Sequence, residues 1–304
     1  MYISNKWLKK MINIVNLEMH VTHNCNLTCE ACDHYSNYKT NKWMISPEQA
    51  NDWMGFWKNK INPQTFSILG GEPTLNPDLP EIIKITRNNW PQSKIRVVTN
   101  GFYLFKHPLL PVVLENDSNA TLYLSLHHDS YSYRNKTKPI LDLLIKWVKK
   151  YSINVEVYHS TKTWKKKYIG LGEKMKPFGD NKPRLSWERC GSNKCPQLFD
   201  GKIWKCGPLA YLHIVDEQYK LTKDWEHYLS YKPLEINSSN DQISNFFNLE
   251  EETYCNMCPS NPPLHDIPIP IAGVNYEDET NQITEYFSKI QQKLQLRKIR
   301  FYQK

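Results

Sequence analysis

Cys25-Asn26-Leu27-Thr28-Cys29-Glu30-Ala31-Cys32 is the stretch that decides how this chain is interpreted. Its three cysteines have the spacing C-x3-C-x2-C, and an apolar run that predicts a strand over 14–22 comes directly before it. Three thiols on one loop, predicted over 23–36, lie close enough to bind one metal centre. Cysteine thiolates are the usual ligands of iron–sulfur clusters, and three of them leave one iron of a four-iron cluster open. A site kept one ligand short leaves room for a substrate.

A second motif, Gly70-Gly71-Glu72-Pro73, follows a strand predicted over 64–69. Together, the loop and this motif resemble the radical S-adenosylmethionine (radical SAM) enzymes. In that family SAM chelates the open iron of a [4Fe-4S] cluster, and an electron from the cluster splits SAM into methionine and a 5′-deoxyadenosyl radical that takes hydrogen from the substrate. The resemblance implies that Cys25, Cys29 and Cys32 hold this catalytic cluster.

The resemblance has one departure, and the cysteines have one alternative interpretation. Many family members carry an aromatic residue before the third cysteine, whereas this chain has Ala31, so the adenine of SAM must pack elsewhere. The alternative is a zinc site or a set of disulfides. A zinc site would need a fourth cysteine or histidine nearby, and His20, His23 and His34 are candidates. These histidines do not explain the Gly-Gly-Glu-Pro motif.

Polar residues at strand ends form the expected SAM site. By the resemblance, the Gly70-Gly71-Glu72-Pro73 segment seats the methionyl group, with Glu72 as an acceptor for its amine. Glycines let a backbone approach a ligand closely, although a tight turn would use them too. The resemblance also places Asn100 and Ser125 beside SAM, while Asn100 begins an Asn-Gly pair that an ordinary turn would explain as well. His127 and His128 are candidates for substrate contacts or for structural roles.

Regular alternation of helices and strands predicts the fold. Helices are expected from Pro47, over 78–89 and over 139–150, and further strands over 94–99, 121–126 and 154–159. This order favours a parallel sheet with right-handed crossovers, and ligands gather at the carboxyl ends of such strands. We expect an α/β fold, a partial (β/α)6 TIM-type barrel with a small C-terminal auxiliary-cluster domain.

The first helix has a clear start signal. Ser46 is the expected cap, proline occupies the first turn, and Gln49 completes a capping-box pattern. Trp53, Phe56 and Trp57 follow at helical spacing and are expected to pack against the sheet.

The alternation stops after residue 180, where five more cysteines follow. Cys190, ten residues, Gly201, four residues and Cys206 are similar to the opening of the SPASM and Twitch extensions of the same family, with a hairpin about Asp200-Gly201. The resemblance implies that Cys190, Cys206, Cys255 and Cys258 hold an auxiliary [4Fe-4S] cluster. Full SPASM extensions have seven cysteines, so Twitch is the better match.

Cys195 is the fifth cysteine, and it either replaces Cys190 as a ligand or stands apart from the cluster. In radical SAM epimerases a cysteine returns a hydrogen atom to the substrate radical, so Cys195 is a candidate donor; an incidental buried thiol is the alternative. The expected domains are a radical SAM core over 1–183, an auxiliary-cluster domain over 184–262, and a proline-rich tail over 263–304. The tail's helix, predicted over 279–299, is expected to pack on the barrel or to bind a partner.

The composition fits a globular chain. Its 304 residues suffice for one large α/β domain and a small second one. No apolar run approaches the roughly 20 residues needed to cross a membrane, so no membrane partner is expected. The N-terminus lacks the apolar core of a signal peptide, and we expect a cytoplasmic protein. Eight cysteines in such a chain point to metal rather than to disulfides.

The formal net charge is +8. Such a balance suits either a solvated surface or an anionic partner, and no nucleic-acid-binding module is recognisable. The lysines cluster in two groups: Lys146, Lys149 and Lys150, and Lys162, Lys165, Lys166 and Lys167.

The expected function is reductive cleavage of SAM followed by hydrogen abstraction from a small polar substrate such as a sugar, an aminocyclitol or a nucleotide, giving oxidation (dehydrogenation) or epimerisation. A reductase such as flavodoxin or ferredoxin would supply electrons. Modification of a ribosomally made peptide (RiPP) or of a tRNA base are the alternative activities. Outside enzymes, the alternative is an iron–sulfur electron carrier or sensor, although a carrier would need no SAM seat.

Overall fold

The computed structural model describes residues 11–29, 32–38, 42–128, 130–160, 165–262 and 299–302. The predicted tail helix and the first ten residues lie outside these ranges. The strands are β1 (Ile12–His20), β2 (Ile61–Leu69), β3 (Lys94–Thr99), β4 (Ala120–Leu126), β5 (Asn154–His159), β6 (Gln197–Phe199), β7 (Lys202–Trp204) and β8 (Ile299–Tyr302). The helices are α1 (Pro47–Trp57), α2 (Leu79–Asn89), α3 (Leu110–Glu115), α4 (Tyr131–Lys150), α5 (Pro183–Glu188), α6 (Gly207–Tyr219), α7 (Glu226–Leu229) and α8 (Asn240–Asn248).

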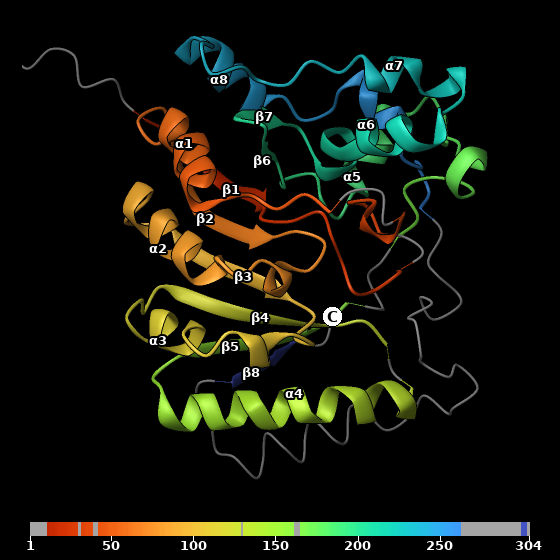
Figure 1. Cartoon of the computed structure of the whole chain (residues 1–304). Helices are drawn as coiled ribbons and strands as arrows, with labels where there is room; N and C mark the ends of the chain where they lie inside the picture. The colour runs from red at the N-terminus through yellow and green to blue at the C-terminus, as the bar shows by residue number, and fades with distance from the viewer. Residues whose placement is uncertain are drawn as a thin grey trace, which may run out of the picture.

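The described strands form one eight-stranded sheet in the order β7-β6-β1-β2-β3-β4-β5-β8. Every neighbouring pair is parallel except the β6–β7 hairpin. The two end strands do not pair with each other within the described chain, so the sheet is open. The predicted α/β fold with a partial barrel is therefore confirmed, and Figure 1 shows α1 to α4 following the sheet while α5 to α8 lie together beside β6 and β7.

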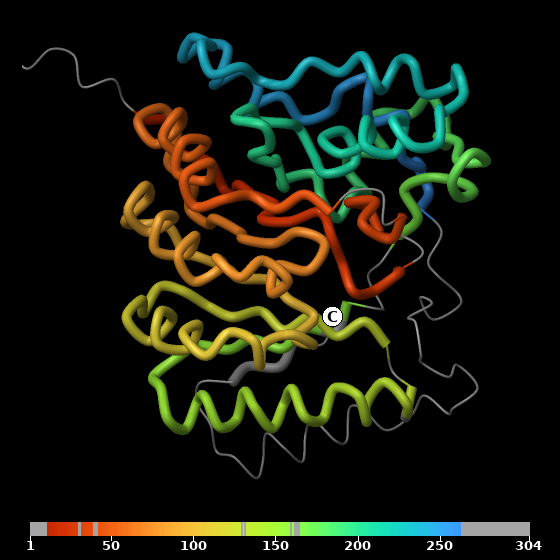
Figure 2. The backbone as a smooth tube through the Cα atoms, in the orientation of Figure 1, coloured from red at the N-terminus to blue at the C-terminus, as the bar shows by residue number. Residues whose placement is uncertain are grey.

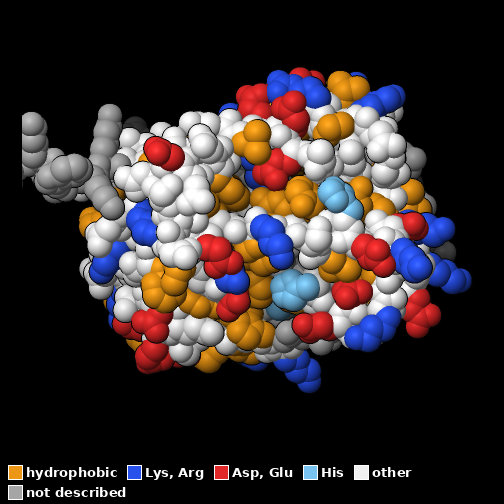
Figure 3. All heavy atoms as spheres, turned by 90° about the horizontal axis from the view of Figure 1, so that it is seen from above, with side chains coloured by type: hydrophobic (Ala, Val, Ile, Leu, Met, Phe, Trp, Pro, Cys, Tyr) orange, Lys and Arg blue, Asp and Glu red, His pale blue; other side chains and the backbone are white. Residues whose placement is uncertain are grey.

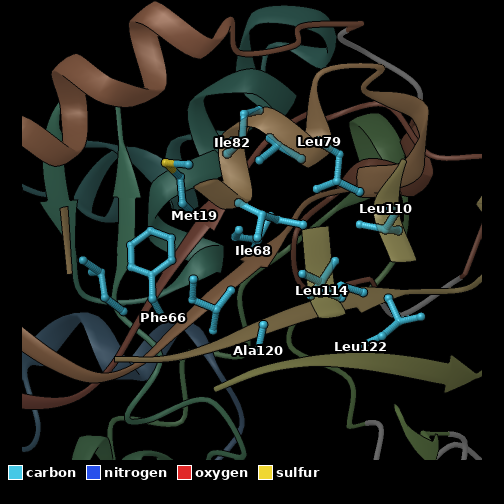
Figure 4. Packing of buried hydrophobic residues seen from close by; sticks show 14 of the residues in the cluster. Met19, Phe66, Ile68, Leu79, Ile82, Leu110, Leu114, Ala120 and Leu122 are labelled. Atoms are coloured by element: carbon cyan, nitrogen blue, oxygen red, sulfur yellow. The ribbon is translucent and has the colours of Figure 1, made fainter. Parts of the chain in front are cut away.

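The two faces of the sheet differ in chemistry. Apolar side chains of alternate positions, among them Met19, Phe66, Ile68 and Leu122, pack under α2 and α3 (Figure 4). Because successive residues of a strand point to opposite faces, the intervening positions turn to the inner face. There the strands carry polar and charged residues: Asn16, Glu18, Ser67, Lys94, Arg96, Tyr123 and Glu156.

The β6–β7 hairpin turns at Asp200 and Gly201, whose φ angles are +53° and +69°. Two positive φ angles match the Asp-Gly turn that the sequence predicts, since such turns need this conformation at both central residues. The Trp57 indole donates a hydrogen bond of 2.8 Å to the Gly201 carbonyl, which fastens the hairpin to α1. The pairing of β6 with β1 joins the second cysteine region to the barrel sheet.

Two sequence predictions need correction. Phe56 was expected in the core with Trp53 and Trp57, but it is 44% exposed while both tryptophans are buried. Helix α4 begins at Tyr131 and not at 139, because the Ser130 hydroxyl accepts a hydrogen bond from the Tyr133 amide and caps it there; Pro139 lies inside the helix.

A second group of buried residues lies apart from the barrel core and centres on α6. It includes Tyr35 from the cysteine loop, Met175 and Trp225, whose indole donates to the Met175 carbonyl at 2.9 Å. The division of the chain at 183 and 262 stays a prediction. Among the described helices, none combines the length and apolar character needed to cross a membrane.

Candidate active site and cluster centres

The first cysteine loop is joined to the Gly-Gly-Glu-Pro segment by backbone hydrogen bonds. The Gly71 amide donates to the Thr22 carbonyl at 2.9 Å, and the Glu72 amide donates to the Asn24 carbonyl at 2.8 Å. Figure 2 shows the two segments side by side at the same end of β1 and β2. The loop after β1 thus rests on the turn after β2.

Glycine is required at positions 70 and 71 for a steric reason that the sequence alone does not show. A Cβ on Gly70 would lie 2.4 Å from the Thr22 carbonyl oxygen, and one on Gly71 would lie 2.2 Å from the Asn24 carbonyl oxygen. Both distances are far below a van der Waals contact. The close approach is therefore made by the chain's own cysteine loop, and it requires glycine at both positions.

Glu72 is buried and hydrogen-bonded to two neighbouring strand ends. Its Oε1 accepts from the Thr74 amide at 3.0 Å and from the Thr74 and Thr99 hydroxyls, while Oε2 accepts from the Asn100 amide at 2.8 Å. Burial raises the pKa of the carboxyl group, and these hydrogen bonds oppose that rise. Glu72 thus ties the turn after β2 to the turn after β3, and Pro73 is buried beside it.

The remaining predicted SAM contacts lie at the same edge. The side-chain amide of Asn100 donates a hydrogen bond to the side-chain oxygen (Oδ1) of Asn26 at 2.8 Å. This bond links the turn after β3 to the cysteine loop. The Ser125 hydroxyl, on β4, bonds to the Ser160 hydroxyl at 3.3 Å. The assignment of these residues to SAM stays a prediction, while their position at one edge of the sheet follows from the parallel topology.

Of the two histidines after β4, His127 faces the cysteine loop. Its Nδ1 lies 4.0 Å from the Cys29 sulfur. His128 is buried, and its Nδ1 accepts a hydrogen bond from the Ser130 amide at 2.9 Å, so this ring helps to shape the turn before α4.

Burial dominates the environment of the loop thiols. Cys29 is buried, and Cys25 and Cys32 are half-buried. Burial, with Asp33 nearby, raises the pKa of Cys32 to about 11, while backbone amides of the following turn lower it. These amides already point at the sulfur, and a metal would have to displace its proton.

The second cysteine group lines one cavity. Its walls include all four predicted auxiliary ligands, namely Cys190, Cys206, Cys255 and Cys258. Burial raises the pKa of Cys206, and the neighbouring Cys258, Cys190 and Cys255 add to that rise. Four cysteines around one cavity are the donor set of a closed [4Fe-4S] cluster, and these residues fit that group.

Cys195 lies elsewhere and does not line this cavity. Its sulfur accepts from the Asn16 side chain at 3.7 Å. Burial raises its pKa, and Glu18 adds to the rise. Both neighbours are on β1, so Cys195 belongs to the inner face of the sheet.

Comparison with protein families gives the decisive finding. Residues 19–161 match the model of the radical SAM superfamily. This stretch runs from the last two residues of β1 to just past β5 and contains both the cysteine loop and the Gly-Gly-Glu-Pro segment. The chain carries a radical SAM domain. Members of this superfamily hold a [4Fe-4S] cluster and SAM, and the matched residues include the cysteine loop, whose assignment as the cluster site stays a prediction.

Curated relatives of the radical SAM domain match over short stretches. A protein of Methanococcus aeolicus named probable GTP 3′,8-cyclase is 32% identical over 96 residues, which cover 31% of this chain and 32% of that protein. The 7,8-dihydro-6-hydroxymethylpterin dimethyltransferase of Methanocaldococcus jannaschii is 34% identical over 85 residues, 28% of this chain and 17% of the relative. The chain therefore spans about a third or less of the length of these relatives.

Solved structures match this chain over different lengths. A crystal structure of BtrN in complex with AdoMet and 2-DOIA has a TM-score of 0.44 and 13% identity, and covers 81% of this chain and 85% of BtrN. Streptococcus suis SuiB bound to S-adenosylmethionine has a TM-score of 0.37 and 20% identity, over 48% of this chain and 34% of SuiB.

The histidines proposed for a zinc site are packed with aromatic rings beside the radical SAM domain's cysteine loop. His20 stacks on Tyr211 with centroids 4.1 Å apart and meets the His34 ring edge-on at 4.5 Å. Burial, followed by the neighbouring His34, lowers the pKa of His23 to about 4. Within the described ranges, no three His, Cys, Asp or Glu side chains converge as the ligands of a single metal ion do. The cysteines of a [4Fe-4S] cluster need not converge on one point, because each thiolate binds a different iron.

Two inner-face residues were not singled out from the sequence. Glu18 lies on β1 and Arg96 on β3, each at a position flanked by apolar residues of the strand. Their side chains are 3.5 Å apart. Charged residues at alternate positions of a predicted buried strand are the signal that could have identified them.

Proposed function

We propose that this protein is a radical SAM enzyme with an auxiliary [4Fe-4S] cluster, which abstracts hydrogen from a small polar substrate bound against the inner face of the sheet. The observation that carries the proposal is the chemistry of that face. A cysteine loop at the strand ends lies above a surface lined by charged and hydrogen-bonding side chains. A surface of this kind suits a substrate with hydroxyl, amino or carboxyl groups.

The contacts on this face form a connected set. Arg96 donates from Nε to the Ser67 hydroxyl at 3.1 Å and lies over the Tyr123 ring, with its guanidinium carbon 5.3 Å from the centroid. Lys94 lies 3.4 Å from Glu156. Each cation is paired with a carboxylate, so the face offers donors and acceptors without a large net charge. This balance favours a neutral or zwitterionic substrate over a polyanionic one.

The charge on the face that Figure 3 presents does not favour nucleic acid. On the face that Figure 3 presents, acidic and basic side chains alternate among the coloured residues and do not gather into one basic patch. A continuous basic surface is the usual footprint of a nucleic-acid-binding protein.

The mechanism assigns a role to each group of residues. Cys25, Cys29 and Cys32 would hold the catalytic cluster, which with SAM supplies the hydrogen-abstracting radical when bound. Glu72 fixes the turns that seat SAM. The inner-face side chains orient the substrate.

For a net oxidation, the auxiliary cluster would be the acceptor of the substrate electron; for an epimerisation, no electron leaves the substrate. Cys190, Cys206, Cys255 and Cys258 would hold that cluster in the region predicted over 184–262. An external reductase such as flavodoxin or ferredoxin would supply the electron that starts each cycle.

The test is anaerobic reconstitution of the full chain, with measurement of iron, sulfide and 5′-deoxyadenosine after addition of SAM and dithionite. We expect about eight irons per chain, since each [4Fe-4S] cluster holds four, together with SAM cleavage. A count of about four irons per chain together with SAM cleavage would contradict the presence of the auxiliary cluster. The full iron count without SAM binding would favour the alternative function, an iron–sulfur electron carrier or sensor.

The choice between Cys190 and Cys195 as an auxiliary ligand gives a direct prediction. Cys190→Ser should lose about four irons per chain, because Cys190 lines the cavity with the other three cysteines. Cys195→Ser should keep them, since its sulfur lies by Asn16 and Glu18. Iron loss in Cys195→Ser but not in Cys190→Ser would reverse the assignment.

Cys195 is further proposed as the hydrogen donor of an epimerisation. Only the protonated thiol can give a hydrogen atom, and burial with Glu18 nearby raises the pKa of this thiol and keeps it protonated. Transfer breaks the S–H bond and forms a C–H bond; one electron from the reductase and one proton then restore the thiol. In D2O, we expect one deuterium at the inverted carbon of the product, and none of that product from Cys195→Ala. Unchanged product and stereochemistry in Cys195→Ala would exclude the role.

A further inference from the structure

A buried lysine lies against the auxiliary cysteines. Lys167 is 8% exposed, and its ammonium nitrogen is 3.3 Å from the Cys190 sulfur. It comes from the segment that precedes α5, away from the cysteines in sequence. A lysine is rarely buried unless its charge is compensated, so the position needs a physical explanation.

The positive charge of Lys167 is compensated by cysteine sulfur. Within the described chain no carboxylate lies at ion-pair distance from the Lys167 ammonium, and Asp33 acts on it only from farther away. The ammonium is thus placed to stabilise negative charge on the thiolates of one site.

A second lysine at the same cavity provides a comparison. Lys205 lines the cavity, but its ammonium lies 3.3 Å from the Glu252 carboxylate. Its side chain also donates to the Leu249 carbonyl. The charge of Lys205 is largely neutralised by this carboxylate, whereas the charge of Lys167 faces the cysteines.

We infer that Lys167 raises the reduction potential of the auxiliary cluster through its charge and its hydrogen bond to the Cys190 sulfur. Reduction adds one electron to the cluster and its thiolates, and a nearby positive charge stabilises the more negative state. Hydrogen bonds to the sulfurs and local charge are among the factors that set cluster potentials. This inference rests on the auxiliary cluster of the proposed function, but not on the identity of the substrate.

The experiment is an anaerobic redox titration of the reconstituted full chain, followed by electron paramagnetic resonance and accompanied by an iron count. SAM binds the open iron, so its addition changes the signal of the catalytic cluster and leaves that of the auxiliary cluster to be followed. The variants are Lys167→Met, Lys167→Gln and the matched control Lys205→Met. Lys167→Gln retains a donor without the charge and is close in size to lysine.

We expect both Lys167 variants to keep about eight irons and to be harder to reduce at the auxiliary cluster. For Lys167→Met, the reduction equilibrium should fall by about tenfold, equivalent to about 59 mV for a one-electron couple. Lys205→Met should shift the potential clearly less, because Glu252 pairs with the charge that is removed.

Four outcomes would overturn the inference. An unchanged potential in Lys167→Met, or an equal shift in Lys205→Met, would remove the specific role of Lys167. Loss of auxiliary iron in both Lys167 variants would make Lys167 a structural residue instead. A wild-type protein with only about four irons would contradict the auxiliary cluster itself, and the inference would fail with that part of the proposed function.

Discussion

Cys29→Ala is expected to abolish formation of 5′-deoxyadenosine, reducing it to the background of the reagents. Cys29 is the buried member of the three loop cysteines, and its sulfur lies toward His127 at the edge of the sheet where the SAM motifs meet. Loss of one of three thiolates leaves the cluster too few ligands to keep the four-iron form. The iron content should fall by about four per chain, and SAM should no longer change the spectrum of what remains.

Cys206→Ala is the reciprocal variant. It removes a ligand from the auxiliary cavity, so about four irons should again be lost, but the response of the remaining cluster to SAM should persist. Together, the iron counts of Cys29→Ala and Cys206→Ala assign one cluster to each group of cysteines. If Cys29→Ala retained SAM cleavage, the loop would not be the catalytic centre and the proposed function would be wrong.

Gly71→Ala is expected to disturb the cysteine loop more than any other single methyl addition near the site. The new Cβ would lie 2.2 Å from the Asn24 carbonyl oxygen and 2.7 Å from the His23 carbonyl oxygen, and backbone atoms cannot move aside as a flexible side chain can. Overpacking of a tight site costs about 1–3 kcal/mol. The loop should shift, so the catalytic cluster should be lost or become labile, with loss of SAM cleavage.

The matched control is Gly55→Ala. Gly55 lies inside α1, and a Cβ there would meet no atom within 4 Å. Alanine in a helix interior is favoured over glycine by about 0.5–1 kcal/mol, so this variant should be slightly more stable and fully active. The measurements are chemical denaturation, iron content and SAM cleavage for both variants. Normal cluster content in Gly71→Ala would show that the loop tolerates displacement.

Local sequence patterns determined much of the architecture. The strand and helix order from β1 to β5 follows from apolar periodicity and from turn residues, which act over a few neighbouring positions. Ser46 caps α1 through its hydroxyl, and Asp200-Gly201 adopts the turn that its residue types favour. The cysteine spacing identifies the radical SAM domain for the same reason, because ligands of one loop are close in sequence.

The predictions that failed depended on competition between local signals. Residue 139 is a proline, but the cap at Ser130 starts α4 earlier, and the helix continues through the proline. Phe56 has helical spacing with Trp53 and Trp57, yet the hairpin covers only part of that side of α1, and Phe56 stays 44% exposed. A periodic pattern gives a helix face, but not how far its neighbours extend.

The sequence by itself determined the chemistry available to this protein: two cysteine groups, a glycine pair, and a strand–helix order that brings the first cysteine group and the glycines to one edge of the sheet. Only the tertiary structure decided how they are used. It separated Cys195 from the four cysteines of the cavity, set Lys167 against Cys190, and explained Gly71 by the carbonyl of Asn24. These relations join residues far apart in the chain, and they depend on how strands pair and loops pack, which no local pattern encodes.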